Sequence, residues 1–320
     1  MTKLFSDYEQ QLMILKEKKL VIEDESYALL CLKEYGYYNL INGYSELFKI
    51  HDKHGNKEYM QSVTLRNIKA LYDFDTELKN IIYKYAIKIE NKVKSSLSYV
   101  FSKKYSPNDM YYLRKECFSV AEKKSNKINQ LINKIKELKE SALNQKSKYY
   151  KNFIHHTQKK HGYVPFWCLI RILSFGTISK FYKLMKGEDQ RSVANELNIK
   201  YEYLASFLEL IVQFRNIVAH GERTFSYLSN SITLSRKLDI YDTIGVPRNK
   251  KMDVLYGSRD IFALLIAFKY FLSKNELKYM FIEIKWALAK LKEEESEEIY
   301  HKVLKKMGLN NEVWEKLDEV

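Results

Sequence analysis

Apolar residues recur every three or four positions along much of the chain, which is the spacing of one face of an α-helix. The longest such stripe runs from Leu65 to Val100 and predicts one long core helix of about ten turns. Shorter periodic or apolar segments predict further helices over 8–18, 25–34, 129–143, 201–219, 260–272 and 276–291. No segment repeats another, so a repeat architecture is not indicated.

Turn-forming residues separate these segments. Pro165 suits the first turn of a helix, and Gly176 with Thr177 is expected to end that helix and cap the next one. The stretch before the turn sequence HDKHGNK, at 51–57, predicts a short strand pair, and 224–257 is expected to be irregular.

Composition favours a helical protein as well. The 320 residues include only 10 Gly and 3 Pro, too few for the many corners of a sandwich or barrel, while 46% are hydrophobic. We therefore predict an all-α fold, or one nearly so. We divide it into an N-terminal helical segment (1–60), a helical core (61–292) with a basic insertion (103–160), and an acidic helical tail (293–320).

The net charge of +14 is unevenly distributed. The segment 103–160 holds 15 Lys and Arg against 5 Asp and Glu, whereas 292–320 holds 5 against 9. A basic, helical, tyrosine-bearing segment fits an anionic chain such as RNA, and a plain lysine-rich solvated face is the alternative. The candidate RNA-binding residues are Lys123, Lys124, Lys127, Lys134, Lys136, His155, His156, Lys159, Lys160 and Arg223.

Several functional classes lack support. The longest uncharged apolar run, 261–268, is far too short to span a membrane, and the start MTKLFSDYEQ has no signal-peptide core, so we expect a soluble cytoplasmic protein. Nucleotide-binding, esterase and zincin motifs are missing, and three distant cysteines indicate neither a disulfide framework nor a zinc site. We expect no cofactor and no metal.

The most informative chemistry lies at the end of the segment 208–223, where Arg215, Asn216 and His220 arrive together. A histidine can exchange protons with a ribose 2′-OH or a leaving 5′ oxygen, and a guanidinium can hold the charged phosphorane. Asn216 can hold a ribose, a phosphate or the imidazole in place. The alternative is a plain helix end, with Arg215 in a salt bridge and His220 as a cap.

Helix geometry constrains this pair. Arg215 and His220 are five positions apart, which places them roughly 140° apart around an ideal helix. Two copies about a two-fold axis would instead set one chain's histidine beside the other chain's arginine. A catalytic pair therefore predicts a homodimer.

The segment FRNIVAHGER resembles the R-x4-6-H signature of HEPN ribonuclease domains. Together with YYNLINGY, LYDFDTELKNIIYKYAIKIEN and FIHHTQKKHGYVPFWCLIRILSFGTISKFY, it makes the chain similar to the Abi-like abortive-infection family, the AbiD and AbiF group, from about Tyr8 to Tyr227. The ending MGLNNEVWEKL is also similar.

This resemblance implies a HEPN-like helical bundle with long core helices and a smaller N-terminal element, acting on RNA in bacterial anti-phage defence. It implies a growth-arresting toxin, with Arg215 and His220 as catalytic pair and Asn216 as helper. Some members associate with a small non-coding RNA that acts as antidote or guide. Two sets of residues in the matching blocks each have two interpretations. Glu90 can form an ion pair with Arg215 or pair with a neighbour on its own helix. Tyr37, Tyr38 and Tyr44 can stack on RNA bases or form a packed corner of aromatic rings that holds the N-terminal segment to the core.

Two main hypotheses follow. The first is a metal-independent endoribonuclease toxin whose R-x4-H site forms across a homodimer. The second is a non-catalytic RNA-binding module that acts in complex with a small non-coding RNA. A protein adaptor working through the apolar segment 261–291 is a third reading, although core burial also explains that segment.

Overall fold

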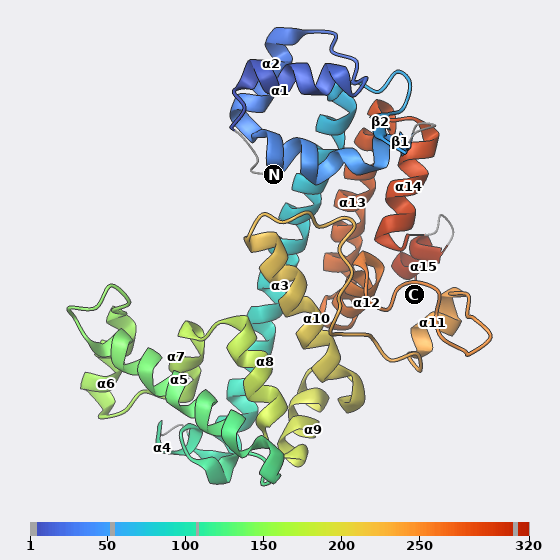
Figure 1. The fold of residues 1–320 in the computed structure, drawn as a ribbon. Coiled ribbons are helices and arrows are strands. Elements are labelled where there is room, and N and C mark those ends of the chain that lie inside the picture. Colours follow the sequence, from blue (N-terminus) through green and yellow to red (C-terminus); the bar gives the residue numbers. More distant parts are fainter. Residues whose placement is uncertain (1–4, 52–54, 107–108, 310–312, 320) are drawn as a thin grey trace.

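One helix of 41 residues, α3 (Leu65–Tyr105), organises the molecule (Figure 1). In this computed structural model, which describes residues 5–51, 55–106, 109–309 and 313–319, α3 is about 60 Å long at 1.5 Å per residue. Thr64 begins it as a capping box with Asn67, and its buried face is the apolar stripe of the sequence. The predicted long core helix is confirmed.

The remaining elements are mostly helices joined by short loops. The N-terminal part contains α1 (Tyr8–Glu17), α2 (Glu25–Tyr35), the π-helix η1 (Tyr38–Asn42), the 3-10 helix η2 (Ser45–Phe48), β1 (Lys49–His51) and β2 (Lys57–Tyr59). After α3 come α4 (Asp109–Tyr112), η3 (Lys115–Cys117), η4 (Glu122–Lys124), α5 (Ser125–Leu143), α6 (Asn152–His161), α7 (Phe166–Leu169), η5 (Ile170–Ile172) and α8 (Phe175–Leu184). The rest consists of α9 (Gly187–Glu196), α10 (Tyr201–Ala219), α11 (Asp239–Ile244), α12 (Ile261–Phe271), α13 (Lys274–Glu294), α14 (Glu297–Met307) and α15 (Val313–Glu319).

Helices α13 and α10 both pack against α3 (Figure 1). Near the start of α3, the side-chain amide of Asn67 donates to the Glu294 carbonyl at 3.1 Å. Further along, Lys88 pairs with Glu276 at 3.1 Å, so α13 runs antiparallel to α3. The almost wholly buried α12 packs against α10 and α3 and fills the space between them.

The N-terminal elements agree with the sequence. Asp24 caps α2 by accepting from the Tyr27 backbone N–H at 3.1 Å, so the helix begins at Glu25 as its predicted span has it. The predicted strand pair is also present, with Lys49 opposite Tyr59 in an antiparallel register. Residues 52–54 of its turn lie outside the described part.

Several predicted boundaries were wrong. The break before α8 comes at Ser174, whose side chain caps the helix, so Gly176 lies inside the first turn instead of ending a helix. Helix α5 begins at Ser125, four residues earlier than expected, whereas Pro165 opens a helical stretch as predicted, made of the single turn of α7 and then η5. The irregular stretch 224–257 contains α11, and the sequence reading missed α9 altogether.

The fold class is mainly helical, as predicted, with one two-stranded sheet in the described residues. The division at residues 60 and 292 stays a prediction. Helix α3 lies within the proposed core, α13 extends two residues beyond its end at 292, and the tail helices α14 and α15 pack against α13.

Candidate functional site

Helix α10 carries the three predicted catalytic residues at its C-terminal end. Its buried face includes Leu204, Phe207, Leu208, Ile211 and Phe214, and it packs between α3, α8, α9 and α12. His220 caps the helix, and Gly221 follows with a left-handed φ of +71° that turns the chain away. The predicted span of 201–219 is confirmed.

His220 is exposed and opens onto a groove of about 580 Å³. Its backbone N–H donates to the Asn216 carbonyl at 3.0 Å, while its imidazole makes no hydrogen bond or ion pair with any described residue. The groove lining includes Tyr38, Asn39, Asn42, His220, Arg223 and Asn230, and we call this the His220 groove.

The wall opposite His220 comes from η1, the π-helical turn of the YYNLINGY segment. Tyr38 is 80% exposed there, and Asn39 and Asn42 are exposed beside it. Neither carboxamide, nor that of Asn230, is hydrogen-bonded within the described chain. This wall therefore offers an open aromatic face and free donor and acceptor groups.

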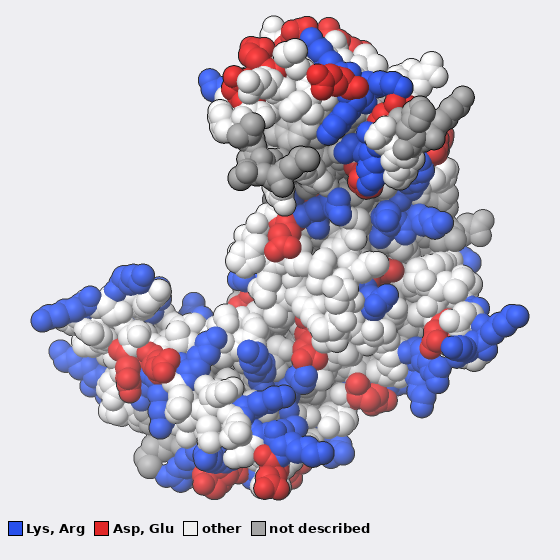
Figure 2. All heavy atoms as spheres, in the orientation of Figure 1, with Lys and Arg blue, Asp and Glu red and all other residues white. Residues whose placement is uncertain are grey.

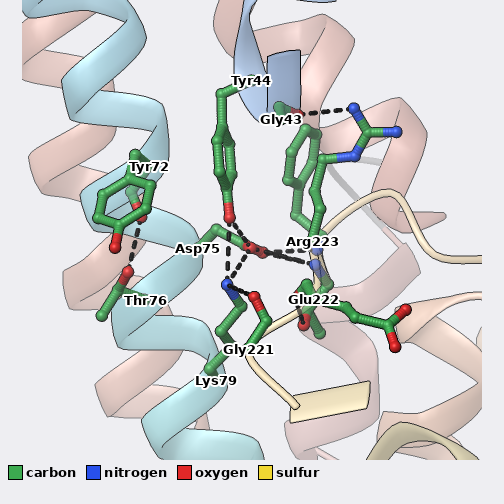
Figure 3. A network of polar contacts seen from close by, with 11 residues as sticks. Gly43, Tyr44, Tyr72, Asp75, Thr76, Lys79, Gly221, Glu222 and Arg223 are labelled. Carbon is green, nitrogen blue, oxygen red and sulfur yellow. Dashed lines mark hydrogen bonds and ion pairs between the residues drawn. The ribbon is translucent and has the colours of Figure 1, made fainter. Parts of the chain in front are cut away.

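A buried carboxylate holds the segment after His220 in place (Figure 3). Asp75 of α3 is fully buried, and its Oδ2 accepts from the Tyr44 hydroxyl at 2.7 Å and pairs with Lys79 Nζ at 3.0 Å. Its oxygens also accept from the backbone N–H groups of Thr224, at 3.1 Å, and Phe225, at 2.6 Å. These contacts offset the cost of burying the charge.

Further hydrogen bonds hold the loop that follows His220. Lys79 Nζ donates to the Gly221 carbonyl at 3.4 Å, and Arg223 Nη1 donates to the Gly43 carbonyl at 2.7 Å (Figure 3). Burial and the neighbouring carboxylate raise the pKa of Tyr44, which keeps its hydroxyl protonated as a donor. The loop that follows His220 is thus tied to both α3 and η1.

The sequence reading missed Asp75 and Lys79. A signal was present, because Leu71, Asp75, Leu78 and Ile82 follow one another at steps of four, three and four. A charged residue at a core position of an apolar stripe requires a buried partner. That partner is the loop at Thr224 and Phe225.

The three tyrosines of the YYNLINGY segment differ in role. Tyr44 is buried, with its ring stacked 6.3 Å from Phe225 and edge-on 5.2 Å from Tyr72, so the packed-corner interpretation is confirmed for it. Tyr37 is half-buried against the core. Only Tyr38 presents its ring to solvent, so a packed corner is wrong for this residue.

Arg215 does not line the His220 groove. Its guanidinium lies 5.8 Å from the centre of the Tyr83 ring, and Nη1 donates to the Asn216 side-chain oxygen at a long 3.5 Å. Its Nε is buried and has no hydrogen-bond partner among the residues that the structure describes. Within one chain, the predicted catalytic arginine and histidine therefore face different surroundings.

Glu90 pairs with Lys94 one turn along α3, at 2.7 Å, and both side chains are 12% exposed. The interpretation as a helix-neighbour pair is confirmed. No ion pair between Glu90 and Arg215 occurs in the described structure.

A second groove, of about 550 Å³, lies between α5 and α8. Its floor includes Leu131 and Leu184, and its lysines are Lys124, Lys127, Lys134, Lys180 and Lys183. We call it the basic groove. Figure 2 shows Lys and Arg side chains crowding the end of the molecule where these helices lie.

The lysines of the basic groove fall into two kinds. Lys183 pairs with Glu209 of α10 at 2.5 Å, and Lys124 Nζ donates to the Lys183 carbonyl at 3.1 Å. Lys127, Lys134 and Lys180 are exposed and have no ion pair with a described residue, so we call these three the free groove lysines. Their charge is available to a polyanion.

The structure separates the predicted RNA-binding residues. Lys124, Lys127 and Lys134 meet in the basic groove, whereas Lys136, two residues beyond Lys134 and about 160° from it around α5, does not line it. Lys123 is exposed in η4. His155, His156, Lys159 and Lys160 lie on α6, outside both grooves, with the His155 ring 5.8 Å from Tyr150. Lys180 and Lys183 were not predicted, because α8 lies outside the charge-rich segment.

The described residues hold neither a metal-ligand cluster nor a membrane-spanning helix. No group of three or more His, Cys, Asp or Glu side chains is arranged to hold a metal ion there. Among the helices of the described chain, none is long and apolar enough to cross a membrane.

Comparison with known proteins identifies the family. The model of the Abi-like protein family matches residues 30–226, which include η1, α3, the whole lining of the basic groove and the part of the His220 groove up to Ser226. The chain belongs to the Abi-like protein family, and membership suggests a role in abortive-infection defence. No curated protein and no solved structure matched the chain.

Proposed function

We propose that this protein is an RNA-binding, HEPN-like effector of abortive infection that cleaves RNA without a metal ion. The observation that carries the proposal is His220, an exposed and unpartnered imidazole that opens onto a groove beside a buried, charge-anchored loop. Histidine side chains exchange protons near neutral pH, which suits general acid-base catalysis.

The reaction needs two proton transfers. One imidazole takes the proton of the ribose 2′-OH as that oxygen attacks the adjacent phosphorus, and a protonated imidazole returns a proton to the 5′ oxygen as its bond to phosphorus breaks. The products are a 2′,3′-cyclic phosphate and a 5′-OH. A guanidinium stabilises the charge on the phosphorane.

The arginine is proposed to come from a second copy of the chain. Arg215 lies outside the groove that its own His220 lines, while Tyr83 and Ile87 expose apolar surface one turn apart on α3 beside it. A two-fold dimer packed over this surface would bring Arg215 of one protomer to His220 of the other. Asn216 is exposed between these residues on α10 and would orient the imidazole or the phosphate.

A mixing experiment tests both the chemistry and the dimer. Wild-type protein should cut single-stranded RNA in EDTA, and Arg215→Ala and His220→Ala should each abolish cutting while His301→Ala, an exposed histidine on α14, should not. Equal mixing of the two inactive variants should restore roughly a quarter of the wild-type rate, because half of the dimers are mixed and each has one intact site of two. Cutting that survives in His220→Ala, or that needs a divalent metal, would overturn the mechanism.

The second candidate is a binding module that holds a small non-coding RNA and does not cut. The packing of Arg215 on Tyr83, away from the His220 groove, favours it. A discrete RNA that co-purifies with the protein, together with no cleavage of added RNA by wild type, would establish this function in place of the nuclease.

A further inference from the structure

The two grooves share one helix. Glu209, which lines the basic groove, and His220 are eleven residues apart on α10. Eleven residues at about 100° each amount to three full turns plus about 20°, so the two positions lie on the same face of the helix. They are separated by about 17 Å along its axis.

Two polar side chains of α10 lie between the groove positions. Gln213 and Asn216 occupy the same face of α10 at intermediate positions, the first half-buried and the second exposed. The Gln213 amide nitrogen donates to the Ser231 hydroxyl at 2.5 Å, and its oxygen accepts from the Ser229 hydroxyl at 2.7 Å, so this side chain is held by the loop beside the helix. Asn216 is the exposed polar side chain of this face between the two groove positions.

The two grooves differ in charge, so each suits a different part of an RNA strand. In the described residues the His220 groove has one basic side chain beside its histidine, Arg223, and one acidic side chain, Glu222. The basic groove has five lysines against the single carboxylate of Glu209. Phosphate attraction is therefore concentrated in the basic groove, while the His220 groove supplies the open ring of Tyr38 and free carboxamides suited to a base.

We propose that this face of α10 is a continuous track for single-stranded RNA, with the backbone gripped in the basic groove and an unpaired nucleotide placed against Tyr38 and His220. At about 3.4 Å per stacked nucleotide, 17 Å corresponds to roughly five nucleotides between the grooves. An RNA needs about seven or eight nucleotides to occupy both. Duplex RNA does not fit this assignment, because its bases are unavailable for stacking.

This inference rests on the proposed RNA function, but its test does not need cleavage. Full-length His220→Ala protein would be titrated with fluorescent single-stranded RNAs of 3, 5, 8 and 12 nucleotides. Affinity should rise steeply between 5 and 8 nucleotides and little beyond. Changing the free groove lysines to Gln should weaken the 12-mer roughly 10- to 100-fold at 0.1 M salt and reduce the salt slope by about 2.

The control variant changes three exposed lysines away from the track, Lys274, Lys278 and Lys306, to Gln, and it should bind the 12-mer as the parent does. A 12-mer with 4-thiouridine at one end or the other locates the strand. Its two ends should cross-link to different peptides, one within α5 or α8 and one within 38–44 or 220–230. Both ends cross-linking to one groove, or equal effects of the two lysine triples, would refute the track even in an RNA-cutting protein.

Failure of the proposed function gives a different pattern. If no RNA binds at any length, the RNA function and the track are both wrong. If wild type leaves RNA uncut while the 12-mer still cross-links at both grooves, the track stands and the nuclease mechanism is wrong.

Discussion

Asp75 offers the sharpest test of how the His220 loop is held. Asp75→Asn conserves the side-chain volume but removes the charge that Lys79 pairs with at 3.0 Å, and one carboxylate acceptor becomes an NH2 donor. The side chain is fully buried, so lost contacts are not replaced by water. Breaking a buried ion pair by removing one partner costs about 3–5 kcal/mol. We expect unfolding at a temperature lower by roughly 6–20 °C, at about 2–4 °C per kcal/mol.

Urea and thermal unfolding followed by circular dichroism would measure this loss. The matched control is Asp73→Asn, two residues earlier, whose carboxylate is 56% exposed and whose pair with Lys69 should contribute no more than about 1 kcal/mol. Proteolysis should also become faster within 221–230, because this loop loses its anchor.

A double-mutant cycle isolates the ion pair from the hydrogen bonds. Lys79→Met keeps most of the aliphatic stem, and combined with Asp75→Asn it should cost about 1–3 kcal/mol less than the two single changes added together. If Asp75→Asn is within 1 kcal/mol of wild type, or the cycle shows no coupling, the buried carboxylate does not anchor the loop as argued.

Other parts of the structure yield three further predictions. Burial raises the pKa of Glu295 from 4.5 to about 8, so the fold favours its protonated form. The free energy of unfolding should fall by about 1–3 kcal/mol between pH 5 and 8. Urea unfolding at several pH values should show that Glu295→Gln removes this pH dependence. An unchanged pH dependence in the variant would contradict the raised pKa of Glu295. Gly308→Ala should cost more than about 2 kcal/mol, because a Cβ there would lie 2.4 Å from Asp260 Oδ2. Gly162→Ala, with the same φ of +76° and nothing within 4 Å, should cost only about 1 kcal/mol in the same assay. Tyr38→Ala should weaken single-stranded RNA binding about 5- to 100-fold by fluorescence anisotropy and Tyr38→Phe should not, whereas equal losses would exclude stacking.

The sequence was sufficient where one periodic signal determined the structure. The stripe from Leu65 to Val100 became α3, and the span 201–219 became α10, because each buries one continuous apolar face. It was insufficient where two signals competed, as at Ser174, where a capping side chain outweighed the expected break at Gly176.

The site was predictable in part, for a similar reason. His220 and Arg223 could be chosen as chemistry-bearing residues at a helix end, and the structure places both in one groove. Lys180 joins the basic groove only through the packing of α8 against α5, which charge counting along the chain does not detect. The eleven-residue spacing that aligns the two grooves became visible only once Glu209 was known to line one of them.

The most direct test of the central claim, that His220 cuts RNA, is sequencing of the RNA bound to wild-type protein and to His220→Ala, with the chemistry of the RNA ends determined. We predict short fragments with 2′,3′-cyclic phosphate and 5′-OH ends on wild type, and longer RNA without those ends on the variant. The same RNA, with the same lengths and ends, on both proteins would contradict the claim.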